Sequence, residues 1–280
     1  KMSVVINTNY AAVLARKNLA EVQRQMDKSV ERLSSGKRIN NAADDAAGSA
    51  IAGRMESQIR GLTMGIRHAK DGQSLVGTAE GAMQEVNKML QRMRELAVQA
   101  SSGVANSTDK DYLNLEMKQL VSQITAISVN TKFNDQALLT GGAFKFYTDI
   151  DVAGTAITTP GADMAASALG VTAVAMSIGG AVDATAAGIR AAITKIDTAL
   201  ATVDNRRAAL GAISNRFDHI VDNLQNVIMN TVQSQSRIVD ADFSIETTNL
   251  TRNTVLQQAA TSMLAQANAQ KNSVLTLIQQ

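Results

Sequence analysis

The chain has 280 residues, a formal net charge of +2, no cysteine, no tryptophan, one proline and eight aromatic residues. A charge this close to zero gives no global field that points to nucleic acid or an anionic membrane. The lack of cysteine excludes disulfides, thiolate metal sites and a thiol nucleophile. Small and aliphatic residues supply most of the apolar content, which suits long helix–helix seams better than an aromatic-rich globular core.

The amino-terminal segment up to residue 33 predicts an amphipathic helix. Its apolar residues recur in steps of three or four, the spacing of one helical stripe. The basic residues of this segment are spread around the helix without interleaved aromatics, so a solvated face is favoured over a nucleic-acid patch. We expect neither a membrane span nor a cleavable signal, because no apolar run is long enough. The stripe comprises Leu19, Val22, Met26, Val30 and Leu33.

A polar stretch, 31–52, interrupts this periodicity and precedes a longer one. Gly36 is expected to end the first helix, because a left-handed backbone costs glycine little. Asn41, Asp44 and Asp45 are expected at the start of the next helix, where their oxygens accept hydrogen bonds from free N–H groups. A second polar stretch, 240–244, contains Asp240 and Asp242 and has the same character.

Two long heptad patterns lie between these polar stretches. The first runs from Met55 to Ala100 with Gln73 as its one clear polar intruder, and the second runs from Ile189 to Ile238. Such alternation of three and four is typical of coiled coils. A shorter stripe at 113–127 predicts a further helix, capped by Thr108 or Asp109.

The middle of the chain has a different pattern. Residues 144–150 alternate and hold three of the eight aromatics, which predicts a strand with a hairpin partner at 152–159 and Gly154 in the turn. Residues 160–180 show no clear pattern. After the second polar stretch, a last apolar stripe is expected at Val255, Met263, Val274 and Ile278.

The order of these segments is nearly palindromic and predicts a mainly α protein. We expect a long antiparallel helical bundle or coiled coil, with paired terminal helices and a small insert containing a β-hairpin. The expected domains are a terminal coiled coil (1–44 with 237–280), a helical bundle (45–140 with 186–236) and a short surface insert (141–185). The terminal helices have narrow stripes, so they are expected to become ordered only against copies of the same chain.

Catalytic chemistry is not indicated. His68 and His219 lie beside stripe positions without metal-ligand spacing, and no phosphate-binding loop or nucleophile elbow occurs. The paired aspartates at both polar stretches are explained by helix capping. We therefore expect no enzyme, no cofactor and no metal.

The polar stretches and the symmetry carry a resemblance to the bacterial flagellins. At the amino end the resembling motifs are ERLSSGKRINNAADDAAGSAIA (31–52), DGQSLVGTAEGAM (71–83) and LQRMRELAVQA (90–100). At the carboxyl end they are RAALGAISNRF (207–217), SRIVDADFSIET (236–247) and LQQAATSMLAQAN (256–268). Residues 141–185 match no part of the family core. One departure is Lys271, where the family often has proline.

The resemblance implies a filament subunit that is exported unfolded through the flagellar type III apparatus to the cell exterior. There it would polymerise beneath a cap, and its paired terminal helices would line the filament channel. The implied partners are further copies of the chain, an export chaperone on the last 40 residues, and the cap and hook-junction proteins. An animal innate flagellin receptor is a further implied partner. The surface of this chain that it would bind contains Arg92, Leu96 and Glu116. No nucleic acid and no membrane insertion are implied.

Three other interpretations remain open. A hook–filament junction protein has similar ends, a secreted adhesin would place its site in 141–185, and a chemoreceptor hairpin would share the heptads. Under the filament interpretation, the junction between the polar stretches should serve assembly, with bonds across it or to a neighbouring subunit. The expected junction residues are Arg32, Arg38, Asn41, Asp44, Asp45, Asp240 and Asp242. Replacing Asp44 by alanine should then impair assembly more than the ~1 kcal/mol loss of a helix cap suggests.

Overall fold

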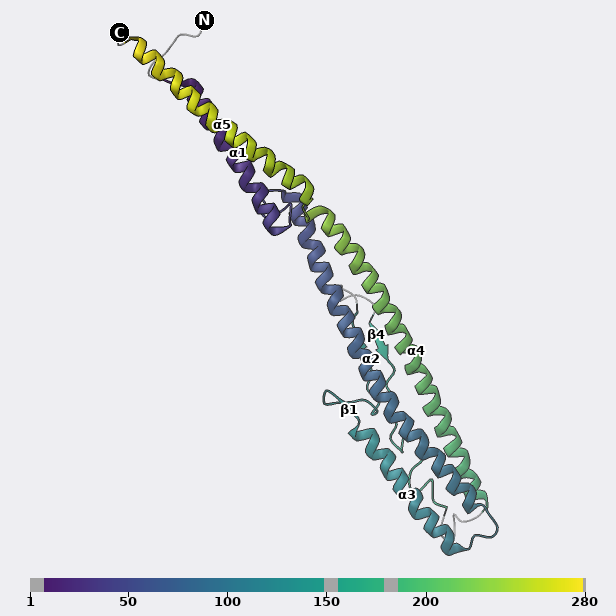
Figure 1. Cartoon of the computed structure of the whole chain (residues 1–280). Coiled ribbons are helices and arrows are strands. Elements are labelled where there is room, and N and C mark those ends of the chain that lie inside the picture. The colour runs from purple at the N-terminus through teal and green to yellow at the C-terminus, as the bar shows by residue number, and fades with distance from the viewer. Residues whose placement is uncertain (1–7, 149–155, 179–185, 279–280) are drawn as a thin grey trace. The chain divides into compact units, whose positions relative to one another are not determined.

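The computed structural model describes residues 8–148, 156–178 and 186–278, with the backbone alone for 271–278. The expected mainly α fold is confirmed in this part of the chain (Figure 1). Two compact units are formed, one by residues 1–59 with 229–280 and the other by residues 60–228. The five helices of the described ranges are α1 (Tyr10–Ser35), α2 (Ala46–Ala100), α3 (Ser107–Asn130), α4 (Ala186–Val239) and α5 (Phe243–Ile278).

The helix ends follow local side-chain chemistry. Helix α1 ends at Gly36, whose φ of 68° is the left-handed conformation expected from the sequence. Helix α3 is capped by Asn106, not by Thr108 or Asp109. The Asn106 side chain accepts a hydrogen bond from the Asp109 N–H (2.8 Å), and the Asp109 carboxylate accepts one from the Asn106 N–H (3.1 Å). Asp109 is therefore the second member of a capping box.

The core of the larger unit is formed by the apolar stripes of α2, α3 and α4, which lie side by side in Figure 1. Gly72 permits a close approach in this core, because a Cβ atom there would lie 2.6 Å from the ring of Phe217. Phe217 is fully buried and meets the Phe146 ring edge-on, with centroids 5.6 Å apart. The fully buried stripe residues include Met83, Val86, Leu90, Met93, Ala97, Met117, Ile124, Ile196 and Val203.

Polar side chains spaced seven residues apart on α2 connect this helix to α4. Gln73 donates to Asp218 (2.5 Å), and Asn87 donates to Asp204 (2.8 Å). Ion pairs join Glu80 to Arg207 (3.6 Å) and Arg94 to Asp197 (2.7 Å). The α4 partners come in descending order as the α2 partners ascend, so the two helices are antiparallel, as predicted.

The chain between α3 and α4 includes two short hairpins. Strand β1 (Lys132–Phe133) pairs with β2 (Gln136–Ala137), and the two residues between them have positive φ angles (48° and 63°). Strand β3 (Phe144–Phe146) pairs antiparallel with β4 (Ile157–Thr159), in agreement with the predicted hairpin. Its expected turn at Gly154 lies outside the described residues.

The described residues after β4, 160–178, are not confined to the surface of the larger unit. Met164, Val171, Met176 and Ile178 are almost fully buried and belong to the same hydrophobic cluster as α2 and α4. The expectation of a surface insert at 141–185 therefore needs correction. Because small residues surround these apolar ones, an irregular backbone can approach the helices closely without a periodic pattern.

Replacing Phe217 by alanine should destabilise the larger unit by about 3–5 kcal/mol, because it leaves a cavity beside Gly72 and Phe146. Guanidinium chloride unfolding followed by circular dichroism measures this loss. Val227→Ala on the same helix, where the side chain is 40% exposed, is the matched control and should change stability by less than about 0.5 kcal/mol. Equal losses in the two variants would contradict the packing described.

Candidate functional site

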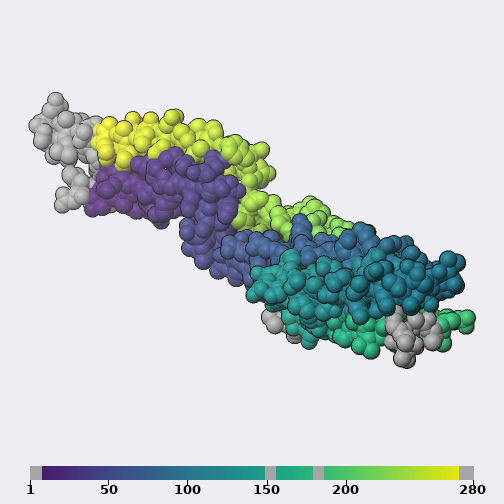
Figure 2. Space-filling model, turned by 90° about the horizontal axis from the view of Figure 1, so that it is seen from below, coloured from purple at the N-terminus to yellow at the C-terminus, as the bar shows by residue number. Residues whose placement is uncertain are grey.

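The terminal helices α1 and α5 form an antiparallel pair (Figures 1 and 2). Asn9 donates to the carbonyl of Ala267 (3.0 Å), and Gln257 donates to the side chain of Gln23 (2.7 Å). Near the other end of the pair, Arg32 forms an ion pair with Glu246 (2.9 Å). These contacts run in opposite directions along the two helices, which fixes the antiparallel arrangement.

The contact line of this pair, here called the terminal seam, has a strict heptad spacing and buries polar side chains among apolar ones. Ser29, Asn253 and Glu246 are 4%, 5% and 6% exposed and are the most buried polar residues of the pair. Polar groups buried in this way contribute little hydrophobic stabilisation and must be hydrogen-bonded. The seam consists of Ala12, Ala15, Leu19, Val22, Met26, Ser29 and Leu33 on α1, and of Glu246, Leu250, Asn253, Gln257, Ala260, Leu264 and Ala267 on α5.

Several large apolar side chains lie outside this seam. Val30, Val255 and Met263 were expected in the stripes of the pair, but they are 49%, 59% and 64% exposed. The stripe prediction is corrected at these positions because the heptad positions that face the partner helix are their neighbours in the sequence, such as Ser29 and Leu264. Val274 and Ile278 lie outside the residues whose side chains are described. We call the exposed set the outer apolar face: Tyr10, Val13, Leu14, Val30, Phe243, Ile245, Val255, Leu256 and Met263.

The first polar stretch folds into a compact connector around Asp44. The Asp44 carboxylate accepts hydrogen bonds from the backbone N–H groups of Asn40 (3.3 Å) and Asn41 (3.1 Å) and forms an ion pair with Lys28 (2.9 Å). The Lys28 ammonium, together with these N–H groups, lowers the pKa of Asp44 from 3.8 to about 2. Asp45, not Asp44, caps α2, by accepting from the Gly48 N–H (2.9 Å).

The two polar stretches bond to each other. The Arg38 backbone N–H donates to the Val239 carbonyl (2.6 Å), and its guanidinium donates to the Ile238 carbonyl (2.6 Å). The Ala241 N–H donates to the Gly36 carbonyl (3.0 Å). These bonds hold the end of α1 against the turn between α4 and α5.

The remaining polar residues of this junction act within their own segments. Asn41 donates to Glu31 (3.3 Å), and Asp240 accepts from the Ser236 hydroxyl (2.6 Å). Asp242 caps α5 by accepting from the Ser244 N–H (2.8 Å). The structure thus gathers all seven predicted junction residues in one unit, although only Arg32 and Arg38 use their side chains across the two segments.

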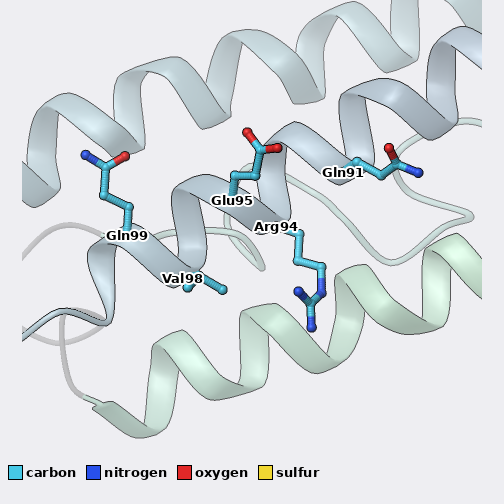
Figure 3. Close-up of a pocket in the computed structure, with 5 residues that line it drawn as sticks. All are labelled: Gln91, Arg94, Glu95, Val98 and Gln99. Atoms are coloured by element: carbon cyan, nitrogen blue, oxygen red, sulfur yellow. The ribbon is translucent and has the colours of Figure 1, made fainter.

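The surface expected to face an innate receptor is only partly accessible. Arg92 donates to Glu116 (2.9 Å), and this carboxylate raises the pKa of the Arg92 guanidinium. Leu96 is fully buried and therefore offers no accessible surface, which corrects its assignment. Next to this pair, Gln91, Arg94, Glu95, Val98 and Gln99 line an open hollow of about 500 Å³, with Arg94 directed toward α4 (Figure 3).

Within the described residues, no cluster of three or more metal-ligating side chains occurs, and His68 Nδ1 lies 3.0 Å from the Tyr147 carbonyl. None of the described helices is apolar over a stretch long enough to cross a membrane. The most developed feature of the described chain is therefore the terminal pair, with its connector and its outer apolar face.

Comparisons with known proteins agree with the sequence motifs. Residues 6–143 match the bacterial flagellin N-terminal helical region, and residues 193–278 match the bacterial flagellin C-terminal helical region. A flagellin of Halalkalibacterium halodurans is 42% identical, covering 98% of this chain and 100% of the relative. A protein of Treponema maltophilum named flagellar filament 31.3 kDa core protein is 36% identical, covering 99% and 100%. The crystal structure of Bacillus cereus flagellin is 30% identical with a TM-score of 0.48, covering 56% of this chain and 88% of that one.

Sequence reasoning missed the polar residues of the terminal seam. Ser29, Asn253 and Gln257 do not appear in the predicted stripes, because those stripes contain apolar residues alone. The available signal was the uninterrupted alternation of three and four from Glu246 to Ala267, which continues through the polar positions.

The lowered pKa of Asp44 predicts a pH dependence. Its carboxylate stabilises the fold above its ordinary pKa, so this stabilisation is present at neutral pH and is lost as the pH falls from 3.8 toward 2. Thermal unfolding measured against pH should show that Asp44→Asn is less stable than the parent chain at pH 7, with a gap that closes in this acid range. Asp135→Asn, whose side chain is 95% exposed, should keep a constant offset. An Asp44→Asn gap that persists at pH 2 would contradict the assignment.

Proposed function

The chain belongs to the bacterial flagellin family, and from that premise we propose that it is a structural subunit of the flagellar filament. In this proposal, copies of the chain assemble through the outer apolar face of α1 and α5. The filament subunit needs no catalytic residues, no metal and no cofactor. The name of the Treponema maltophilum relative, a core protein of the flagellar filament, supports the same role for this chain.

The observation that carries the proposal is that the terminal pair leaves large apolar side chains exposed, while the most buried side chains of its seam are polar. Its seam holds Ser29, Asn253 and Glu246, while Phe243 and Met263 are 68% and 64% exposed. Fully burying a large apolar side chain contributes about 1.5–3 kcal/mol, so several such residues on each copy give a strong drive toward association. Large apolar side chains left exposed in such number are typical of an interaction surface. The partner that covers the outer apolar face is a second copy of this chain, because both helices of the pair lie in the segments that match the family.

The finer aspects of the proposal rest on family membership. The chain would be exported unfolded through the flagellar type III apparatus and would polymerise outside the cell beneath a cap. An export chaperone would bind the last 40 residues, and hook-junction proteins would meet the first subunits. Arg92 and Glu116 would be accessible to an animal innate receptor, since both side chains are about half exposed.

Deleting residues 1–40 or 241–280 should abolish polymerisation and leave the larger unit folded, because the core of that unit lies within residues 60–228. Circular dichroism and cooperative thermal unfolding test the fold, and electron microscopy of seeded samples tests filament formation. Filaments formed by either truncated chain would refute the assembly role of the terminal pair.

A single charge on the outer apolar face should also block assembly. Met263→Glu places a carboxylate where the proposal requires apolar burial, so the critical concentration for polymerisation should rise at least about tenfold. Ser262→Glu adds the same charge at the neighbouring exposed position and is the matched control, expected to have a smaller effect. Sedimentation of seeded samples measures the unpolymerised fraction. Equal effects of the two substitutions would argue against an apolar contact at Met263.

A further inference from the structure

We propose that the ion pair between Arg32 and Glu246 determines the register in which α1 and α5 pair. The inference concerns how one chain pairs its own ends. It rests on the proposed function in two respects. A uniform register matters because the copies assemble, and the experiment below uses filaments.

The apolar residues of the terminal seam do not specify a register. The two helices align row by row, with Ala12 opposite Ala267 and Leu33 beside Glu246 at the two ends. Both rows repeat every seven residues, so a slip by one heptad again brings small and aliphatic residues together. Alanine and leucine in these rows therefore support several pairings about equally well.

Two of the polar contacts also discriminate poorly. Asn9 donates to a backbone carbonyl at Ala267, and any residue at that level would supply an equivalent acceptor. Gln23 and Gln257 join two neutral amides, which can each donate or accept and so can find other partners after a slip.

The ion pair is different because it is charged and enclosed. The Glu246 side chain is 7% exposed and that of Arg32 is 26% exposed. One Glu246 oxygen accepts from Arg32, and the other, Oε2, is buried without a hydrogen-bond partner among the described residues. The carboxylate therefore depends on a single cation, and its removal would leave a buried uncompensated charge.

A slip by one heptad removes that cation in either direction. One slip places Glu246 level with Met26, a thioether that cannot neutralise a carboxylate. The opposite slip moves Glu246 beyond the end of α1 at Ser35 and places the Arg32 level beside Asn253. Polar residues at single core positions of coiled coils fix register in the same way. Within the seam, the described geometry thus assigns register selection to this pair. The bonds of Gly36 and Arg38 to the turn between α4 and α5 hold the same register at the end of the seam.

Because the chain contains no cysteine, paired cysteines can report the register. Ala12→Cys with Ala267→Cys should form a disulfide in the observed register, and Ala12→Cys with Ala260→Cys should do so only after a slip of one heptad. Leu19→Cys with Ala267→Cys reports the opposite slip. The full-length chain is oxidised in seeded filaments, and intrachain disulfides are quantified by non-reducing electrophoresis and peptide mass spectrometry.

Charge reversal then tests the ion pair. Arg32→Glu should raise the slipped fraction relative to the in-register fraction at least about tenfold. Glu246→Gln, which keeps the side-chain size, should raise it less, and the exchanged pair Arg32→Glu with Glu246→Arg should restore the in-register disulfide. Arg24→Glu is the matched control, because the ion pair of Arg24 with Glu21 lies on the same helix but is exposed at 69% and 53%.

Unchanged disulfide ratios in Arg32→Glu, or ratios equal to those of Arg24→Glu, would overturn the inference. If Arg32→Glu loses all three disulfides, recovery of the in-register one in the exchanged pair supports it, and failure to recover refutes it. The proposed function fails separately, when the parent chain forms no filaments. In that case the same disulfides are read on the unpolymerised chain and still decide the register.

Discussion

The terminal pair depends on one constraint: the most buried side chains of its seam are polar, while the leucine, valine and methionine side chains of the seam are only partly buried. Hydrophobic burial normally stabilises a helix pair from within. Here Ser29, Asn253 and Glu246 occupy positions that leucine or valine would fill in a self-sufficient coiled coil. The seam therefore supplies orientation and spacing with little complete apolar burial, and covering the outer apolar face would add hydrophobic stabilisation that the pair lacks by itself.

The larger unit follows the opposite rule. Its helices bury methionine, leucine and valine in one cluster, to which the irregular stretch after β4 contributes Met164, Val171 and Ile178. Its polar contacts, such as Asn87 with Asp204, connect α2 to α4, and their members on α2 lie seven residues apart. Such a unit has enough buried apolar surface to be stable by itself. The two units therefore differ in whether their apolar surface is already buried within one chain.

Heptad periodicity and capping chemistry were sufficient to predict the long helices, their antiparallel return and the junction between the two polar stretches. They were insufficient to predict which apolar side chains of a helix are buried and which are exposed. Val255 and Met263 continue an apolar spacing but are exposed. The heptad row that faces α1 passes instead through Asn253, Ala260 and Leu264. Leu96 lies in a motif associated with a surface and is buried, since its neighbours at heptad spacing form the core. Residues 160–178 gave no periodic signal because an irregular segment packs through individual side chains.

A fixed register is needed if the outer apolar face is to make the same contacts in every copy of a repeated assembly. An open helical assembly uses the same two unlike surfaces on every copy, so each copy must present them in the same geometry. A slip of one heptad would move α5 along α1 by about 10 Å, at 1.5 Å per residue. Val255 and Met263 would then be displaced by that distance relative to Val13 and Leu14, and a neighbouring copy would meet a different surface. Apolar residues cannot prevent this, because they attract one another without strong preference for register. A charged pair with one buried, otherwise unpartnered carboxylate oxygen can prevent a slip. The buried charge in the seam thus has a role that a more stable, wholly apolar seam would not perform.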